Sequence, residues 1–226
     1  MGNFLQICKS LPFRLPHTYI EHRSLEADMA AKTKARREDL RLKLIDLAEA
    51  QITEQGLASL RARDLAKAGE CSVGAIYNVF TDLDGLVLQV NGRTFQRLGE
   101  QVASAITDME TAPACERLIA LSHAYLDFAQ NNYRLWSALF GIKMTSDANI
   151  PAWYQTTLDL LFAHISKPVS EIFPDFNATD TQLMTRGLFS SVHGVVLLGL
   201  QQRASSAEIS RMLTLILSNL SQNKVF

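Results

Sequence analysis

The sequence predicts an all-α protein in which an N-terminal three-helix helix-turn-helix domain precedes a larger helical domain, with about nine helices in all. Two observations predict this class. Apolar residues recur at helical spacing along most of the chain, and no hairpin signature lies between strand-like runs. With 47% hydrophobic residues in 226, the chain can also bury a substantial core.

Residues 1–32 are expected to form a disordered leader. Lys9, Pro12 and Arg14 interrupt the apolar run that a secretory signal needs. The Met1-Gly2 start lacks the Ser or Thr of a myristoylation site, because Gln6 stands in that place. We hypothesise a disordered leader or an over-extended gene start, with Met29 near the start of the folded chain.

The first four helices are expected from caps and apolar stripes. Gly56 ends the first helix, and Ser72 is a natural N-cap for the third. Thr81 and Asp84 resemble a capping box that opens the long fourth helix. The expected ranges are Thr33–Gln55, Arg61–Ala68, Ser72–Val79 and Thr81–Met109.

Five further helices are expected after the break at Pro113. Capping-box patterns, Thr179 with Gln182 and Ser205 with Glu208, begin the last two. The final helix has apolar residues on more than one side, as in a four-helix bundle formed by two chains. The expected ranges are Ala114–Gln130, Tyr133–Met144, Ala152–Ser166, Asp180–Gln202 and Ser206–Gln222.

Charge and cysteine content narrow the function. A net charge of -1 means that any nucleic-acid contact must use a localised basic region. The stretch from Lys32 to Lys43 is such a region. Cys8, Cys71 and Cys115 have neither metal-ligand nor disulfide spacing, which fits reduced thiols and a cytoplasmic location. The apolar run 192–200 is too short for a membrane span and predicts a buried core helix.

The stretch 65–80, which reads LAKAGECSVGAIYNVF, carries the most specific signal. Two short helices joined by a tight turn make a helix-turn-helix, whose second helix can lie in the major groove. The stretch resembles the DNA-binding signature of the TetR/AcrR family of transcriptional regulators, with matches over residues 34–90. The matching residues are Ala66, Ser72, Gly74, Ile76, Tyr77 and Phe80.

The resemblance implies a helix-turn-helix domain at residues 33–82 and an effector-binding and dimerisation domain at 83–226. It implies a homodimer that binds double-stranded operator DNA with a palindromic sequence, most simply a repressor that a small-molecule effector releases. Small residues on the third helix let it approach base edges, and the polar ends of the Tyr77 and Asn78 side chains can reach phosphates or bases. The expected DNA-binding residues are Lys34, Arg37, Ser59, Arg61, Ser72, Val73, Gly74, Ala75, Tyr77 and Asn78.

Two positions depart from the family pattern. Glu70 occupies the usual turn-glycine position, so a residue with a Cβ has to accept a positive φ or the turn shifts. After Phe80 the chain reads Thr81-Asp82-Leu83-Asp84, where the family often has a lysine that contacts a phosphate. That contact is expected to be missing.

The C-terminal half is less specific. Residues 189–194 resemble the Trp-x-x-x-His-Gly element of one TetR C-terminal subgroup, with Phe189 near the tryptophan position. We prefer the interpretation of His193 as a core or dimer-interface histidine over that of an effector contact. Candidate effector-pocket residues are His123, Trp136, Phe140, Trp153, Phe162 and His193; candidate dimer-interface residues are Leu188, Val192, Val196, Leu213, Ile216, Leu217 and Leu220.

Two other functions remain open. An all-α enzyme finds no support, because no nucleotide-binding, nucleophile or metal motif is present; we expect no catalytic residue, cofactor, metal or membrane partner. An effector-independent DNA-binding protein is the alternative that keeps the helix-turn-helix. Loss of operator binding on addition of a ligand would separate that alternative from a ligand-released regulator.

Overall fold

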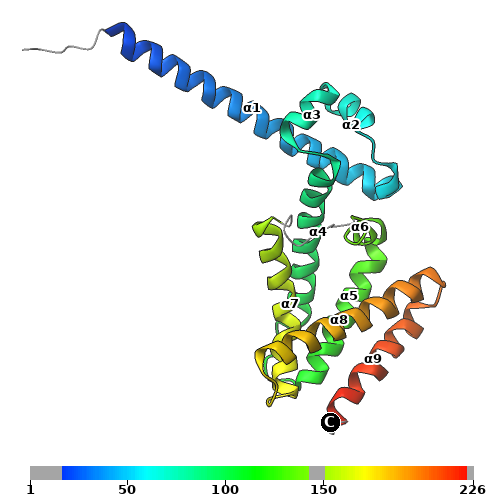
Figure 1. The fold of residues 1–226 in the computed structure, drawn as a ribbon. Helices are drawn as coiled ribbons and strands as arrows, with labels where there is room; N and C mark the ends of the chain where they lie inside the picture. The colour runs from blue at the N-terminus through cyan, green and yellow to red at the C-terminus, as the bar shows by residue number, and fades with distance from the viewer. Residues whose placement is uncertain (1–16, 143–150, 223–226) are drawn as a thin grey trace, which may run out of the picture. The chain divides into compact units, whose positions relative to one another are not determined.

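The computed structural model describes residues 17–142 and 151–222, and every regular element among them is helical (Figure 1). The all-α prediction is confirmed. The helices are α1 (His17–Gln55), a 3₁₀ turn η1 (Leu57–Ser59), α2 (Ala62–Gly69), α3 (Val73–Val79), α4 (Leu83–Ala105), α5 (Ala114–Asn131), α6 (Tyr133–Ala138), α7 (Ala152–Ile172), α8 (Ala178–Gln201) and α9 (Ser206–Gln222).

The chain divides into two units, residues 1–43 and residues 44–226. In the first unit, α1 begins at His17, well before the expected start at Thr33. Pro16 stands directly before this helix, and residues 17–32 contain neither Gly nor Pro. The helix therefore covers part of the segment expected to be a leader, whereas residues 1–16 lie outside the described residues.

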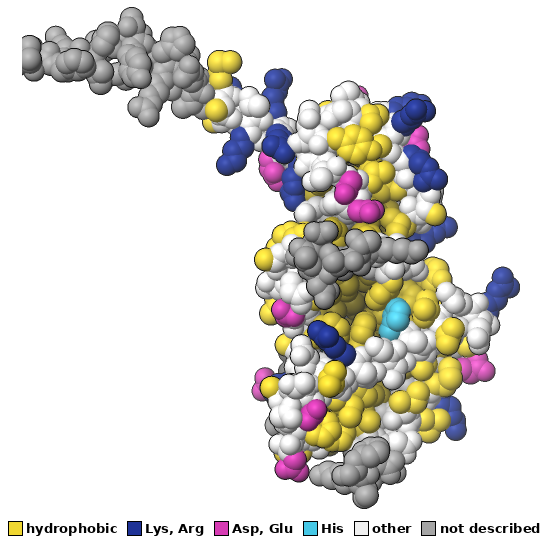
Figure 2. Space-filling view, in the orientation of Figure 1, with side chains coloured by type: hydrophobic (Ala, Val, Ile, Leu, Met, Phe, Trp, Pro, Cys, Tyr) yellow, Lys and Arg dark blue, Asp and Glu magenta, His cyan; other side chains and the backbone are white. Residues whose placement is uncertain are grey.

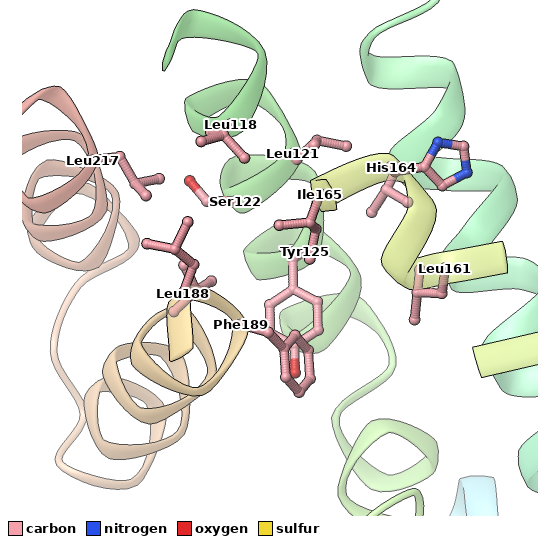
Figure 3. A pocket seen from close by; sticks show the side chains of 12 residues that line it. Leu118, Leu121, Ser122, Tyr125, Leu161, His164, Ile165, Leu188, Phe189 and Leu217 are labelled. Carbon is pink, nitrogen blue, oxygen red and sulfur yellow. The ribbon is translucent and has the colours of Figure 1, made fainter. Parts of the chain in front are cut away.

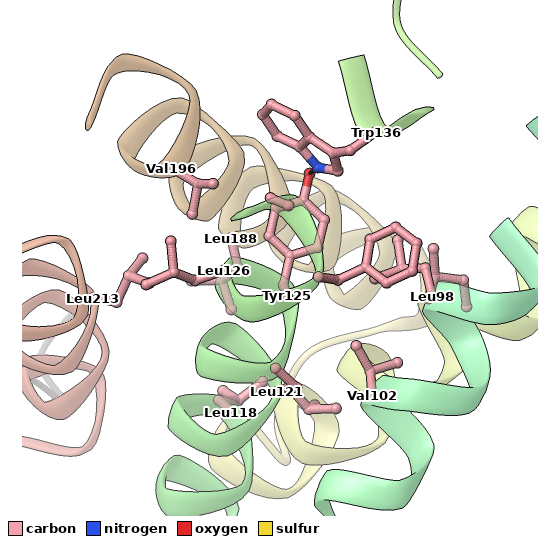
Figure 4. Close-up of a cluster of buried hydrophobic side chains, with 14 of the residues drawn as sticks. Leu98, Val102, Leu118, Leu121, Tyr125, Leu126, Trp136, Leu188, Val196 and Leu213 are labelled. Atoms are coloured by element: carbon pink, nitrogen blue, oxygen red, sulfur yellow. Dashed lines mark hydrogen bonds between the residues drawn. The ribbon is translucent and has the colours of Figure 1, made fainter. Parts of the chain in front are cut away.

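In the second unit, α5 is the central helix of the body, with α4, α6, α7, α8 and α9 packed against it. Figure 4 shows Leu98 and Val102 of α4 on one side of Tyr125 and Leu213 of α9 on the other. Near the start of this unit, the last turns of α1 pack with α2, α3 and the first turns of α4. The side chains buried there include Leu44, Ala48, Ile52, Leu65, Ile76, Leu86 and Val90.

Helix ends agree with the expected caps at two places. The Ser72 hydroxyl accepts a hydrogen bond from the Ala75 N–H at 3.1 Å. At the start of α9, a Glu208 carboxylate oxygen accepts from the Ser205 N–H at 2.8 Å and its hydroxyl at 2.7 Å. These bonds lower the pKa of Glu208. The predicted N-cap and the predicted capping box are confirmed.

Two other caps were assigned to the wrong residue. Asp82, not Thr81, caps α4 by accepting from the Gly85 N–H at 2.7 Å. Asn177, not Thr179, caps α8 by accepting from the Asp180 N–H at 3.0 Å. In both places several short polar residues stand within three positions, and any of them can accept the bond.

Three helix lengths also differ from expectation. Helix α4 ends at Ala105, four residues before the expected end at Met109. Helix α6 ends at Ala138, whereas the expected end, Met144, lies outside the described residues. Helix α7 continues past the expected end at Ser166 and through Pro168 to Ile172. A proline inside a helix removes one hydrogen bond, but burial of the last turn in the core offsets that loss.

Helix α8 combines high hydropathy with partial exposure. By length and composition alone it could cross a membrane, and it is the one such helix among the described residues. It packs against α5, α7 and α9 but leaves Leu183 and Leu198 exposed. The expected buried core helix is therefore buried on one side only.

Candidate nucleic-acid interface and interior cavity

Helices α2 and α3 meet in a tight turn built around Glu70. Its backbone has φ 55° and ψ 41°, the left-handed conformation. The Cys71 N–H then bonds back to the Ala66 carbonyl at 2.9 Å and closes the end of α2. The turn therefore does not shift: Glu70 accepts the positive φ at a position where glycine would be less strained.

Helix α3 has two distinct faces. Ile76 is fully buried and Phe80, directly after the helix, is 6% exposed. Ser72, Gly74, Tyr77 and Asn78 are exposed on the other side, with Val73 and Ala75 half-buried between the two faces. The buried pair anchors the helix, and the exposed side offers small residues and two polar tips.

The other candidate DNA-binding residues lie elsewhere. Ser59 donates its hydroxyl to the Gly56 carbonyl at 2.8 Å. Arg61 donates to the Ala58 carbonyl at 2.7 Å and the Leu60 carbonyl at 2.9 Å. Both side chains are thus hydrogen-bonded to backbone carbonyls of nearby residues. Lys34 and Arg37 are exposed on the part of α1 that belongs to the first unit.

Ion pairs join α4 to the last turns of α1. Arg93 donates to Asp46 at 2.6 Å and to Glu49 at 3.2 Å, and Arg97 pairs with Glu49 at 2.6 Å. The hydrogen bond with Asp46 raises the pKa of Arg93. Partly exposed pairs of this kind contribute only about 0–1 kcal/mol each, so they fix geometry more than they stabilise the fold.

Helix α6 contacts both α4 and the end of α1. The Asn91 side-chain amide donates to the Ala138 carbonyl at 3.2 Å, and Arg134 donates to the Thr53 carbonyl at 3.2 Å. A Cβ on Gly141 would meet the end of the Leu57 side chain, so this glycine leaves room for η1 beside the end of α6. Sequence reasoning could not find these contacts, because the residues that make them lie far apart along the chain.

Three of the six candidate pocket residues form an aromatic cluster around Tyr125. Trp136 donates its indole N–H to the Tyr125 hydroxyl at 2.9 Å, and that hydroxyl lies 2.8 Å from His193 Nδ1. Phe140 lies against His193 with ring centroids 4.2 Å apart. Burial raises the pKa of Tyr125 and lowers that of His193. The cluster is a packed, hydrogen-bonded part of the body.

The other three candidates lie apart from this cluster. His123 contacts α9, with Nε2 3.1 Å from Thr214 Oγ1. Trp153 packs on Tyr154 and covers Gly92, where a Cβ would lie 2.6 Å from the indole. Phe162 pairs edge-to-face with Phe189 at 5.2 Å.

The interior cavity of the body is lined by other residues (Figure 3). Its volume, counted as the space that the centre of a water molecule can occupy, is about 50 Å³, and the cavity is partly open to solvent. Its lining comes from α4, α5, α7, α8 and α9 and includes none of the six candidates. The lining residues are Val102, Leu118, Leu121, Ser122, Tyr125, Leu161, His164, Ile165, Leu188, Phe189, Val192 and Leu217.

The structure corrects the expected dimer-interface residues. Leu188, Val196, Leu213 and Leu217 are at most 7% exposed within one chain, so they pack its own core and are not free to contact a second copy. Val192 and Leu220 are half-buried, and Ile216 is exposed. The helical spacing of these apolar residues was predicted correctly. Because the final helix is apolar on more than one side, the sequence could not show which side packs into the core of its own chain.

Five large apolar side chains of α8 and α9 are between 40% and 61% exposed: Leu183, Leu198, Met212, Leu215 and Ile216. Figure 2 shows hydrophobic side chains on the surface over these helices. We refer to these five residues as the α8–α9 apolar face.

The fold matches many solved structures. A TetR-family transcriptional regulator from Streptomyces coelicolor has a TM-score of 0.57 and 19% identity, covering 81% of this chain and 80% of its own. RolR in complex with resorcinol has a TM-score of 0.59 and 17% identity, covering 85% and 98%. A TetR regulator from Rhodococcus sp. RHA1 has a TM-score of 0.55 and 14% identity, covering 83% and 99%.

Sequence comparison adds no closer relative: no family model matches the chain, and neither does any curated protein. The assignment therefore rests on the order and packing of the helices, with α2 and α3 as the helix-turn-helix and α4 to α9 as the body. The chain has the fold of the TetR-type transcriptional regulators.

Proposed function

We propose that this chain is a sequence-specific DNA-binding transcriptional regulator in the cytoplasm, found on the nucleoid when it is bound to DNA. The exposed side of α3 carries this proposal. Gly74 leaves room for a close approach to base edges, while Tyr77 and Asn78 supply hydrogen-bonding tips. Because Ile76 and Phe80 are buried, the helix can present this side as a rigid surface.

The regulator acts as a homodimer through the α8–α9 apolar face. Scattered apolar residues are common on surfaces, but five large ones on two adjacent, packed helices indicate an interaction surface. Two copies joined there would form a four-helix bundle. A dimer reads two half-sites, so the proposed operator is palindromic with half-sites one helical turn or a multiple apart.

A small-molecule effector releases the regulator from DNA, which makes it a repressor. The support is the interior cavity of the body and the solved neighbour RolR, which was determined with the ligand resorcinol. An effector that binds best to a conformation with mis-spaced reading helices shifts the population away from DNA.

A competition gel shift tests the DNA-binding proposal. Purified protein is titrated against DNA from around its own gene, at two salt concentrations and with nonspecific competitor. We expect binding that resists competitor and that weakens as salt rises, because phosphate contacts release counterions. Binding that competitor abolishes at both salt concentrations would refute sequence-specific recognition.

A further inference from the structure

We propose that the interior cavity binds small, uncharged, mostly apolar molecules of about one ring that carry a hydroxyl group, and that Ser122 accepts the hydrogen bond from that hydroxyl. This inference rests on the proposed function, because it names the chemical class of the effector.

The lining excludes charged ligands. None of its side chains is Asp, Glu, Lys or Arg, and most are Leu, Ile, Val or Phe. A carboxylate or an ammonium ion moved into this space would lose much of its hydration, and the lining has no Asp, Glu, Lys or Arg side chain to pair with it. An apolar ring, by contrast, gains from leaving water, roughly in proportion to the area it buries.

Ser122 is the buried polar group of the lining. It is 3% exposed, and Figure 3 shows its hydroxyl among Leu118, Leu188 and Leu217. The hydroxyl donates its proton to the Ile119 carbonyl at 2.7 Å. Its oxygen still has a lone pair to accept with, so a ligand that donates a hydrogen bond is preferred over one that only accepts.

The other polar groups of the lining do not change this preference. The Tyr125 hydroxyl already accepts from Trp136 (Figure 4) and lies 2.8 Å from His193 Nδ1, so both of its hydrogen-bond partners are protein side chains. His164 borders the cavity and also the groove between α4 and α7. It lies at an edge of the site, where its ring can meet a second polar group of a ligand.

The cavity's size sets the ligand's size. Each enclosed water needs about 10–15 Å³ of space open to its centre, so 50 Å³ corresponds to a few waters or one small ring. Phe189 forms a wall shared with the groove between α7 and α8, where it packs against Phe162.

An NMR titration of the ¹⁵N-labelled full chain, without DNA, tests the proposal with phenol, toluene and benzoate as probes. Phenol and toluene have nearly the same shape but differ in the hydroxyl, and benzoate adds a charge. We expect phenol to bind roughly five- to tenfold more tightly than toluene, which is the effect of one buried neutral hydrogen bond. Benzoate should not bind at the cavity.

Ser122→Ala should remove the preference for phenol and leave toluene binding unchanged. The matched control is Ser170→Ala on α7, whose hydroxyl makes the same bond three residues back, to the Lys167 carbonyl at 2.8 Å, but on the exposed surface. That variant should behave as the wild type. Val192→Phe, which fills the cavity from α8, should abolish binding of both phenol and toluene.

The proposal is overturned if phenol and toluene bind equally to the wild type, if benzoate competes with phenol, or if neither neutral probe binds. The NMR titrations contain no DNA, so their results do not depend on operator binding. A failed gel shift would instead refute DNA recognition and leave the cavity's ligand class standing, so the two failures are distinguishable.

Discussion

The α2–α3 pair and the α8–α9 pair are joined by turns of the same backbone geometry, but the side chains that they expose differ in chemistry. In each, a residue with positive φ ends the first helix: Glu70 at 55° and Arg203 at 60°. Two positions later a serine, Ser72 or Ser205, begins the second helix. The backbone bonds match as well, since the residue after each turn donates to the carbonyl five residues back at 2.9 Å.

The two pairs differ in what they leave exposed. Helix α3 exposes glycine and polar tips, whereas α9 exposes Met212, Leu215 and Ile216. Local backbone geometry therefore does not decide which helix we propose to read DNA and which we propose to join subunits. The chemistry of the exposed side does, and the following predictions test that division.

The largest effect is expected at the buried isoleucine of each second helix. Ile76 and Ile209 are both 0% exposed, and Ile209 packs directly on Gly199. Replacement by alanine should lower the free energy of unfolding by about 2–5 kcal/mol in either pair. Chemical denaturation measures this, with Leu160→Ala, an exposed leucine of α7, as the control that should change little. A tolerated Ile76→Ala would mean that the DNA-binding helix is not anchored as described.

The next effect separates the pairs. Leu215→Glu places a charge on the α8–α9 apolar face and should weaken self-association by roughly 2 kcal/mol or more, without unfolding the chain. Sedimentation velocity over a concentration series measures the monomer–dimer equilibrium. Leu160→Glu carries the same change at a 65% exposed leucine outside the face, and equal loss of dimer in both variants would contradict the assigned interface.

Buried neighbours of that face should respond differently. Leu213→Glu and Leu217→Glu put a carboxylate into a core where the leucines are 1% and 2% exposed. Their first effect is expected to be loss of the folded protomer, with loss of the dimer as a consequence. Circular dichroism distinguishes the two outcomes.

On the DNA side, Tyr77→Ala should weaken operator binding by about 1–3 kcal/mol while leaving stability unchanged, since the side chain is 48% exposed. A fluorescence-polarisation titration against the operator measures this. Tyr133→Ala removes a tyrosine of similar exposure, 42%, from α6. Operator affinity that falls equally in both variants would remove Tyr77 from the DNA surface.

The smallest effect concerns the turns. Arg203→Gly relieves a left-handed residue and should stabilise the protein by up to about 1 kcal/mol, provided that the gain exceeds glycine's extra entropy in the unfolded chain. Arg211→Gly, an exposed position inside α9, should destabilise it by about 1 kcal/mol. Thermal melts compare the two, and shifts of the same sign would show that the backbone at Arg203 is not strained.

Sequence reasoning succeeded where one local interaction decides the structure. Ser72 and the Ser205–Glu208 pair were found because a cap needs only residues a few positions apart. The strain at Glu70 was foreseen for the same reason. The early start of α1 was missed because helical propensity in residues 17–32 is ordinary and no apolar stripe marks it.

The helical body was predicted less well, because tertiary packing decides it. The cavity draws residues from five helices, and Ser122 resembles any other serine inside a helix until α8 and α9 are placed against α5. Aromatic residues drew attention as pocket candidates, yet Trp136 and His193 satisfy each other through Tyr125. The likeness of residues 189–194 to one C-terminal subgroup stays a prediction.

The separation of faces on α3 has a consequence for how such a protein changes over generations. Substitutions at Gly74, Tyr77 or Asn78 leave the buried contacts of Ile76 and Phe80 intact, because the two sets point to opposite sides of one short helix. If α3 reads DNA as we propose, a lineage can change its operator without passing through an unstable protein. After gene duplication, two copies can come to control different genes while each keeps the inherited scaffold.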